Sequence, residues 1–562
     1  MTSDKKTVSL LADLFVKKGL TDIVISPGSR NAPIILAFAN HPKINALSVV
    51  DERSAAFFAL GMAQQSGKTV AIACTSGSAP LNYAPAIAEA YYQKIPLLIL
   101  TADRPPEMID VGDGQTIRQE NVFANFIKKS IQLPLDIEDE SAFEEVNKTL
   151  NEAIHQTVFP VAGPVHINIP FDEPLYGVVS EQIESRVLKF TMAPKEMQAE
   201  LEEVFVSDWL ACKKVMILVG QHQPSQELNQ LLQEFSSNKH LVVLSETTSN
   251  LNGSDFIDSI DNLLSAINDE EASDFQPDML ISIGGAIVSK QIKKFLRKHR
   301  PKAHWHIDGS GEKRDTFYCL SHAPAMEPVH FLKAVLPKVA TLESSYQRRW
   351  LARRAKVEYL RHEYLSHIKY SDLKVFDILL NHIPADSLLH LGNSTPVRYS
   401  QLFGSLARFQ YLSNRGVSGI DGQISTAAGS AFISRKLNTI ISGDLGFFYD
   451  SNALMNHYLP ANLKIIVINN GGGGIFRFIP GPDSSNHLEK FFEARHSWKA
   501  EHLALAFDVH YFKAENEETL TSILPEFYAE LSRPALLEIF TPPEENAKIL
   551  RDYFVFLKTA GH

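Results

Sequence analysis

Cysteines are scarce in this chain: its 562 residues include three, Cys74, Cys212 and Cys319. They lie far apart and form no C-x-x-C pair, which argues against a cysteine-held metal cluster and suits a reducing cytoplasm. The sequence also lacks an uninterrupted apolar run of about 18 residues, so we expect no membrane span. Residues 1–6 lead into a charged, amphipathic segment and not into the apolar core of a signal peptide. We therefore expect a cytoplasmic protein.

Excess positive charge is missing as well. The formal net charge is −11, which argues against nucleic acid as the main partner. No G-x-G-x-x-G fingerprint occurs, and this disfavours a nicotinamide-dependent oxidoreductase. The segment 61–69 imitates a phosphate-binding loop, but five residues separate its glycines where four are needed, and Gly67-Lys68-Thr69 opens a strand instead of a helix. Nucleotide hydrolysis is rejected on these grounds.

Strand-like and helix-like segments alternate along the whole chain. At about 150 residues per domain, its length suggests three or four domains. The alternation predicts an α/β protein with three doubly wound parallel sheets, in domains at 1–180, 195–340 and 370–562. The first and third blocks look alike in plan. The connector at 337–372 is rich in arginine and lysine and is interpreted as a solvated helix.

A carboxylate and a carboxamide follow two successive strands of the third block. Gly443-Asp444 ends the first strand, and Asn469-Asn470-Gly471-Gly472 ends the second, with a helical segment between them. Parallel strands joined by a crossover helix deliver both loops to one sheet edge, so Asp444 and Asn470 could share a hard cation of the Mg²⁺ kind. The glycines would let the backbone approach a diphosphate closely. An ordinary pair of strand–helix turns is the alternative.

Three strand ends of the first block carry further candidates. Arg30 follows the turn Ser26-Pro27-Gly28-Ser29, where its guanidinium could grip a carboxylate; a capped turn with an exposed arginine is the commoner outcome. Glu52 heads a largely apolar helix, so burial could raise its pKa and let it share a proton with a ligand nitrogen; a capping or dipole role is the alternative. The small-residue loop Thr75-Ser76-Gly77 could admit a planar ring, although many buried turns look the same.

The third block offers a second set of candidates. Gly392-Asn393-Ser394 ends a strand, and Arg398 follows about one helical turn later. Residues 414–422 form a glycine-spaced loop before a small-residue helix. This loop has the backbone freedom and the arginine, Arg415, expected for diphosphate binding at a helix N-terminus. A plain glycine-rich connector is the alternative.

These motifs together resemble the thiamine-diphosphate enzymes of the pyruvate-decarboxylase and acetolactate-synthase type. Within that class the closer resemblance is to the synthase family of menaquinone biosynthesis. The matching segments are Ser-Pro-Gly-Ser-Arg at 26–30, Asp-Glu-Arg-Ser-Ala at 51–55, Ala-Asp-Arg-Pro at 102–105, Gln-Thr-Ile-Arg-Gln at 115–119, Gly-Asn-Ser at 392–394, Asn-Arg-Gly-Val-Ser-Gly-Ile-Asp-Gly at 414–422 and Gly-Gly-Gly-Ile-Phe at 472–476. The resemblance implies pyrimidine-binding, central and diphosphate-binding domains in that order.

The resemblance also implies roles for individual residues. Glu52 would hydrogen-bond N1′ of the cofactor's aminopyrimidine, while Asp444, Asn470 and the carbonyl of Gly472 would ligate Mg²⁺ or Mn²⁺. The other cofactor-binding residues would be Thr75, Ser76, Gly77, Gly392, Ser394, Arg415, Ser418 and Ile420. The substrate-binding residues would be Ser29, Arg30, Arg104, Gln115, Lys290, Ser394, Arg398 and Phe476. Of these, Arg30, Gln115 and Arg398 would be catalytic together with Glu52.

The implied activity is decarboxylation of 2-oxoglutarate followed by 1,4-addition of the remaining four-carbon unit to isochorismate. Both substrates are dianions, which would explain several cationic residues in one pocket. In this family the pyrimidine and the diphosphate are held by different subunits, so we expect a homodimer or homotetramer. Three positions depart from the family pattern, Gln291, Gly114 and Leu445, where some relatives carry Arg, Asn and Gly.

Two alternatives remain open at this point. The first is another thiamine-diphosphate 2-oxoacid decarboxylase or acetolactate-type synthase, for which a less cationic pocket is expected. The second is a non-catalytic protein that kept the fold, and the presence of Glu52, Asp444 and Asn470 argues against it.

Overall fold

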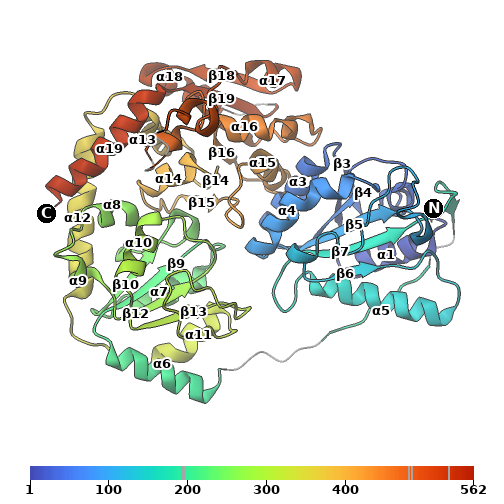
Figure 1. Ribbon diagram of the computed structural model, residues 1–562, viewed down its shortest axis with the longest axis horizontal. Helices are drawn as coiled ribbons and strands as arrows, with labels where there is room; N and C mark the ends of the chain where they lie inside the picture. The colour runs from blue at the N-terminus through green and yellow to red at the C-terminus, as the bar shows by residue number, and fades with distance from the viewer. Residues whose placement is uncertain (181–182, 191–196, 479–480, 482–484, 530–531, 562) are drawn as a thin grey trace.

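Parallel sheets flanked by helices make up the body of the molecule (Figure 1). The computed structural model describes residues 1–561 apart from 181–182, 191–196, 479–480, 482–484 and 530–531. Within these residues three parallel sheets follow one another along the chain, and a short antiparallel pair joins β1 (Thr2–Ser3) to β8 (Val178–Val179). This confirms the predicted α/β class. None of the described helices combines the length and the apolar character that crossing a membrane requires.

The N-terminal sheet has the strand order β3–β2–β4–β5–β7–β6. Its strands are β2 (Asp22–Ile25), β3 (Asn45–Ser48), β4 (Val70–Cys74), β5 (Leu97–Asp103), β6 (Ser130–Gln132) and β7 (Val165–Pro170). Its helices are α1 (Lys6–Lys17), α2 (Ala32–Ala39), α3 (Glu52–Ser66), α4 (Ala79–Gln93) and α5 (Glu140–Gln156). Because helices cover both faces, the inner strands β4 and β5 are buried along their whole length and read as continuous apolar runs.

The central sheet has the order β11–β10–β9–β12–β13, and all its strand pairs are parallel. Its strands are β9 (Val215–Val219), β10 (Leu241–Ser245), β11 (Phe256–Ile257), β12 (Met279–Ile283) and β13 (Ala303–Ile307). Its helices are α6 (Ala199–Ala211), α7 (Gln226–Phe235), α8 (Ile260–Ser265), α9 (Ala272–Phe275), α10 (Lys290–Lys298) and α11 (Pro328–Val335). The strand order reverses between β9 and β12, where open α/β sheets form a crevice.

The C-terminal sheet has the order β15–β14–β16–β17–β19–β18. Its strands are β14 (Ser387–Leu391), β15 (Phe409–Leu412), β16 (Asn438–Gly443), β17 (Leu463–Asn469), β18 (His510–Ala514) and β19 (Ala535–Phe540). Its helices are α13 (Asp372–His382), α14 (Thr395–Gln401), α15 (Gln423–Ile433), α16 (Asp444–Tyr449), α17 (Glu501–Ala506), α18 (Glu517–Phe527) and α19 (Pro543–Ala560). When the strands of each sheet are numbered in chain order from its own first strand, the two sheets have the same strand order. The similarity predicted between the first and third blocks is therefore a shared sheet topology.

The connector between the last two domains is the helix α12 (Tyr346–Leu365). The helix was predicted correctly, but the prediction of a solvated connector was wrong. Trp350 and Val357 are fully buried, and the Trp350 ring meets the edge of Phe275 at 5.1 Å between centroids. Arginines and lysines alternate with these apolar residues along the helix, so its composition hides an apolar stripe that packs into the core.

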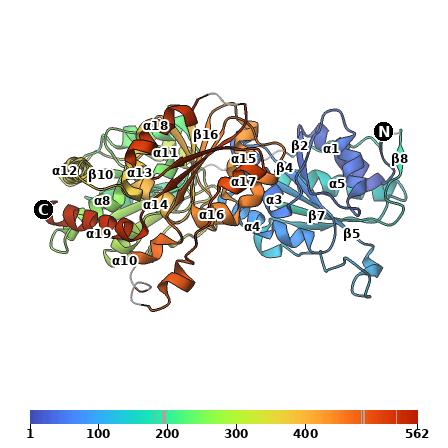
Figure 2. The same ribbon diagram turned by 90° about the horizontal axis from the view of Figure 1, so that it is seen from above.

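The N-terminal and C-terminal domains meet along α3 and α15, which lie side by side (Figure 2). Glycines permit the close approach. A Cβ added to Gly61 would lie 1.9 Å from the carbonyl oxygen of Thr426, and one added to Gly429 would lie 1.9 Å from that of Phe58. Because α3 begins at Glu52 and α15 follows the 414–422 loop, this contact sets the position of both segments.

Candidate active site

The carboxyl edge of the C-terminal sheet brings the predicted metal ligands together. Asp444 begins α16 directly after β16, while Asn470 and Gly472 follow the neighbouring strand β17. The amide of Gly472 donates a hydrogen bond to Oδ2 of Asp444 at 2.9 Å. Asp444 and Asn470 are only 2% and 9% exposed. A carboxylate, an amide oxygen and a main-chain carbonyl are the donors that Mg²⁺ prefers, so the residues present fit a divalent metal.

Two further polar residues beside this set were not identified from the sequence. Nδ2 of Asn470 donates to Oδ2 of Asp372 at 3.1 Å, which orients the amide and leaves its oxygen for another partner. Burial raises the pKa of Asp372 to about 6, and the charge of Asp444 contributes to the increase. Nε2 of His496 lies 3.4 Å from Oδ2 of Asp444, and its ring stacks on Trp498. Asp372 precedes Asn470 by 98 residues, so no local pattern connects the two.

Asn393 organises the loop that follows β15. Its Nδ2 donates to the carbonyls of Asn414 and Gly419 at 2.6 and 2.7 Å, and its Oδ1 accepts from Nη1 of Arg415 at 2.8 Å. Ser418 and Ile420 lie in the same loop, and Ser418 has a positive φ of 64°. The structure thereby brings the predicted diphosphate-side residues close to the Gly392 turn.

Two amides of this loop are already bound within the chain. Those of Gly416 and Val417 donate to the carboxylate of Glu89 at 2.6 and 2.7 Å, and Glu89, on α4, is 1% exposed. We expected a backbone free to bind a diphosphate in this loop. At these two positions, however, the N-terminal domain already holds the backbone amides. Glu89 was not identified from the sequence because the contact joins residues more than 300 positions apart.

Arg398, which is partly buried, and Arg415, which is buried, form a cationic pair. Nη1 of Arg398 donates to the carbonyl of Ser394, which precedes α14 with φ 74°, at 2.5 Å. Burial lowers the pKa of Arg398, and the positive charge of Arg415 adds to the decrease. An anion bound near the two guanidinium groups would relieve this repulsion.

The carboxyl edge of the N-terminal sheet gathers the other substrate candidates. Arg30 is 5% exposed; burial lowers its pKa, and the charge of Arg104 adds to the decrease. Arg104 forms an ion pair with Asp113 at 3.0 Å. Gln115, with φ 59°, donates from Nε2 to the carbonyl of Ser76 at 3.2 Å, so it contacts the small-residue loop after β4.

Glu52 begins α3 but does not cap it. Asp51 caps the helix, because its Oδ1 accepts from the amide of Ser54 at 3.0 Å. Burial raises the pKa of Glu52, and the charge of Asp51 contributes to the increase. Asp51, and not Glu52, therefore has the capping role. Glu52 is a half-buried carboxyl that holds a proton more readily than an exposed glutamate does.

The candidate residues form two groups within one chain. The N-terminal half-site contains Glu52, Arg30, Arg104 and Gln115 with the loop 75–77, and the C-terminal half-site contains Asp444, Asn470, Gly472, Arg398 and Arg415 with the turn 392–394. Among the residues that the structure describes, no hydrogen bond or ion pair joins the two half-sites.

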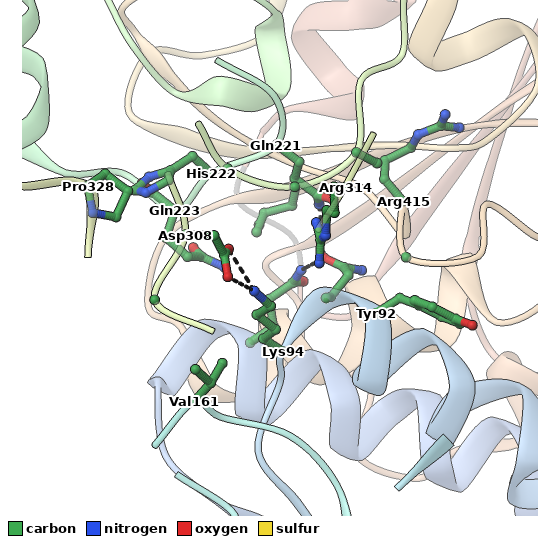
Figure 3. A pocket seen from close by; sticks show the side chains of 18 of the residues that line it. Tyr92, Lys94, Val161, Gln221, His222, Gln223, Asp308, Arg314, Pro328 and Arg415 are labelled. Atoms are coloured by element: carbon green, nitrogen blue, oxygen red, sulfur yellow. Dashed lines mark hydrogen bonds and ion pairs between the residues drawn. The ribbon is translucent and has the colours of Figure 1, made fainter. Parts of the chain in front are cut away.

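Two cavities adjoin the C-terminal half-site. One, of about 360 Å³, is lined by Lys290, Gln291 and Arg398. The other, of about 300 Å³, lies where the three domains meet and includes Arg415 (Figure 3). In the second cavity Nζ of Lys94, at the end of α4, binds the carboxylate of Asp308 after β13 at 2.5 and 2.7 Å. Neither Lys94 nor Asp308 was identified from the sequence.

The remaining predicted positions lie near these edges. Ser29 and Gly114 are exposed, Leu445 donates its amide to Oδ1 of Asp444 at 2.6 Å, and the ring of Phe476 lies 5.8 Å from that of Phe492. No interaction of Ser29 with Arg30 is found within the described residues, so their grouping depends on sequence proximity alone.

Comparison with known proteins identifies all three domains. Residues 5–125 match the thiamine pyrophosphate enzyme N-terminal TPP binding domain, 186–391 the middle domain of thiamine pyrophosphate enzymes, and 392–539 the C-terminal TPP binding domain. Proteins from Flavobacterium johnsoniae, Christiangramia forsetii and Porphyromonas gingivalis are 46%, 44% and 42% identical to the chain. The alignments cover 96%, 97% and 99% of this chain and 96%, 98% and 98% of those proteins, each of which is named 2-succinyl-5-enolpyruvyl-6-hydroxy-3-cyclohexene-1-carboxylate synthase. The chain belongs to this family of thiamine pyrophosphate enzymes.

Proposed function

We propose that the chain catalyses the reaction for which its relatives are named, the thiamine-diphosphate-dependent joining of 2-oxoglutarate and isochorismate with release of CO₂. The product is 2-succinyl-5-enolpyruvyl-6-hydroxy-3-cyclohexene-1-carboxylate. The observation that carries the proposal is the oxygen-rich set Asp444, Asn470 and Gly472 at the same sheet edge as the cationic pair Arg398 and Arg415. An anionic cofactor and anionic substrates both suit this edge.

Each half-site has a distinct task in this proposal. When bound, thiamine diphosphate supplies an electron sink for the carbanion that loss of CO₂ leaves behind. Asp444, Asn470 and the carbonyl of Gly472 would hold Mg²⁺ or Mn²⁺, which would neutralise the charge of the diphosphate. Glu52 would hold and exchange the proton of the aminopyrimidine nitrogen, and its raised pKa suits it for this role.

Substrate binding is the task of the cationic residues. Arg30 and Arg104 on one half-site, and Lys290 and Arg398 on the other, bind carboxylates of the two dianions by charge-assisted hydrogen bonds. Gln115 positions a substrate oxygen through its side-chain amide. The repulsion within each arginine pair favours anion binding, because a bound carboxylate removes it.

We also propose that the active unit is at least a homodimer, with a homotetramer as the larger alternative. Among the described residues no hydrogen bond or ion pair joins the two half-sites within one chain, and we infer that Glu52 of one chain serves Asp444 of another. Sedimentation of the protein at micromolar concentration should give the mass of a dimer or tetramer; a monomer that turns over both substrates would contradict the shared site.

The domain limits and the location complete the proposal. We assign pyrimidine binding to 1–180, the central domain to 195–340 and diphosphate binding to 370–562. A cytoplasmic location is supported by the three free cysteines, of which Cys74 and Cys212 are buried.

A CO₂-release assay tests the proposed reaction. Purified protein with thiamine diphosphate and Mg²⁺ should release CO₂ from 2-oxoglutarate, and isochorismate should accelerate the release while the carboligation product accumulates. Faster release from pyruvate, with no effect of isochorismate, would support the acetolactate-type alternative instead.

A further inference from the structure

A cavity between two domains continues the substrate side of the site toward the C-terminal helix. It has a volume of about 360 Å³ and lies between α10 of the central domain and α14 and α19 of the C-terminal domain. Arg398 and Lys290, both predicted to bind substrate, form one side of it. This volume lies within the range of small-molecule pockets, about 300–1,000 Å³.

Cationic side chains from two helices line this cavity. Lys290 and Lys294 are one turn apart on α10 and share a face, while Arg551 approaches from α19. Among the described residues neither lysine has an ion-pair partner, and Arg551 donates from Nη1 only to the carbonyl of Arg477, at 2.9 Å. Of the residues that line the cavity, Asp261 alone is acidic, and within the described residues it forms no ion pair with Lys290, Lys294 or Arg551.

The acidic residue that lines the cavity is occupied elsewhere. Asp261 is partly buried and accepts from the hydroxyl of Ser289, and it also accepts from the amide of Gln291. Glu246 accepts from the amides of Val288 and Ser289 at 2.7 Å each. The N-terminus of α10 is thus capped by the hydroxyl of Ser289, and the amides of Val288, Ser289 and Gln291 are bound by protein carboxylates. An incoming anion would find the side chains of the lysines and arginines instead.

Much of the rest of the lining is apolar. Leu402, Phe478, Leu550 and Phe554 face the same space as the cations. Flat aromatic and branched side chains bind the face of a carbon ring well, whereas a short flexible dicarboxylate has no such face. The lining fits an anion with a cyclic carbon body.

We propose that Arg551 and Lys294 form a carboxylate-binding subsite for the cyclic acceptor substrate, isochorismate. This inference rests on the proposed function and adds two residues that the sequence did not identify. Arg398 and Lys290 bind the carboxylate nearer the reacting carbons, and Arg551 binds the more distant one through its planar guanidinium. The subsite thereby selects a dicarboxylate whose second anionic group lies beyond the ring.

Steady-state kinetics of charge-removing variants tests this assignment. Arg551→Ala should raise KM for isochorismate about tenfold, equivalent to about 1.4 kcal/mol, and leave KM for 2-oxoglutarate within about twofold. Lys294→Ala should act in the same direction, and Arg551→Lys should lie between Arg551→Ala and the wild type because it keeps the charge without the fork. Lys548→Ala on α19 and Lys298→Ala on α10 are matched controls, since each removes one charge from an exposed ion pair on the same helix.

The outcomes separate this inference from the proposed function. If Arg551→Ala and Lys294→Ala match their controls while the wild type consumes isochorismate, the subsite is refuted and the function stands. A larger increase in KM for 2-oxoglutarate would assign the cavity to the donor and refute the acceptor assignment. A wild type that does not consume isochorismate refutes both. Melting temperatures show whether Arg551→Ala is folded. If it is not, the KM of Lys294→Ala for isochorismate, measured on a different helix of the cavity, tests the subsite.

Discussion

Replacing Gly61 by alanine should destabilise the protein, although alanine is normally the better residue inside a helix. On propensity alone the change would stabilise α3 by about 1 kcal/mol. The added Cβ, however, would lie 1.9 Å from the carbonyl oxygen of Thr426 and 3.0 Å from the amide nitrogen of Ser430, both on α15. Ordinary contact begins at 3.4 Å, so the helices would have to separate locally by about 1.5 Å, the difference between the two distances to the oxygen.

The steric cost should exceed the gain in propensity. Overpacking costs typically 1–3 kcal/mol, and it is more severe where the opposing atoms belong to a helix backbone that cannot rotate away. We therefore expect a net loss of about 1–2 kcal/mol and a melting temperature lower by several degrees. Gly429→Ala should give the same sign, because its Cβ meets the carbonyl oxygen of Phe58.

Calorimetry and urea unfolding measure this effect. Gly443→Ala is the matched control for stability, since its added Cβ meets no atom within 4 Å. An unchanged or higher stability of Gly61→Ala would refute the close packing of α3 on α15. Because α3 carries Glu52 at its start, a lower affinity for the cofactor should accompany the loss of stability.

Three further results are expected. Glu52→Gln should bind thiamine diphosphate in calorimetry but lose about 10²–10⁴-fold in decarboxylation, because an amide cannot exchange the proton; near wild-type turnover would remove Glu52 from this role. Asp444→Ala should abolish Mg²⁺-dependent cofactor binding, and an unchanged affinity in the same titration would refute the metal assignment. Burial alone would raise the pKa of Asp308, but hydrogen bonds from Lys94 and Ser310 lower it from 3.8 to about 2. Because the folded-state pKa lies below the unfolded value, this contribution of about 2 kcal/mol is complete above about pH 4 and is lost as the pH falls toward 2. Asp308→Asn should remove that acid-side slope from the pH profile of the unfolding free energy, and equal slopes in both proteins would contradict the ion pair.

The sequence predicted the sheets and their ligand-binding edges because both follow from local patterns. Buried strands are continuous apolar runs, and the residues that end them, Asp444 and Asn470, must meet at one edge of a parallel sheet. Asp372, Glu89 and His496 could not be found in this way, since each contacts the half-site through tertiary packing and stands in an ordinary local context. These residues reach the half-site only because the fold brings distant parts of the chain together.

The connector helix, the cavity and the two half-sites show what else could not be predicted from the sequence. Trp350 made α12 part of the core, although its arginines and lysines gave it the composition of a solvated helix. The cavity of Lys290, Arg398 and Arg551 joins residues from two domains, and only the first two belong to recognisable motifs. A sequence also cannot say which copy of a chain supplies each half of a site, because every copy carries both.

Mixing two inactive variants tests the shared active site most directly. Chains with Glu52→Gln and chains with Asp444→Ala, co-expressed in equal amounts, form mixed dimers in which one site carries both substitutions and the other carries neither. If the two residues of a site come from different chains, the mixture should recover about a quarter of the wild-type rate, since half of randomly paired dimers are mixed and each has one intact site. If the mixture stays as inactive as the separate variants while mixed dimers are present, Glu52 and Asp444 serve the same site from one chain, and the account of two half-sites is contradicted.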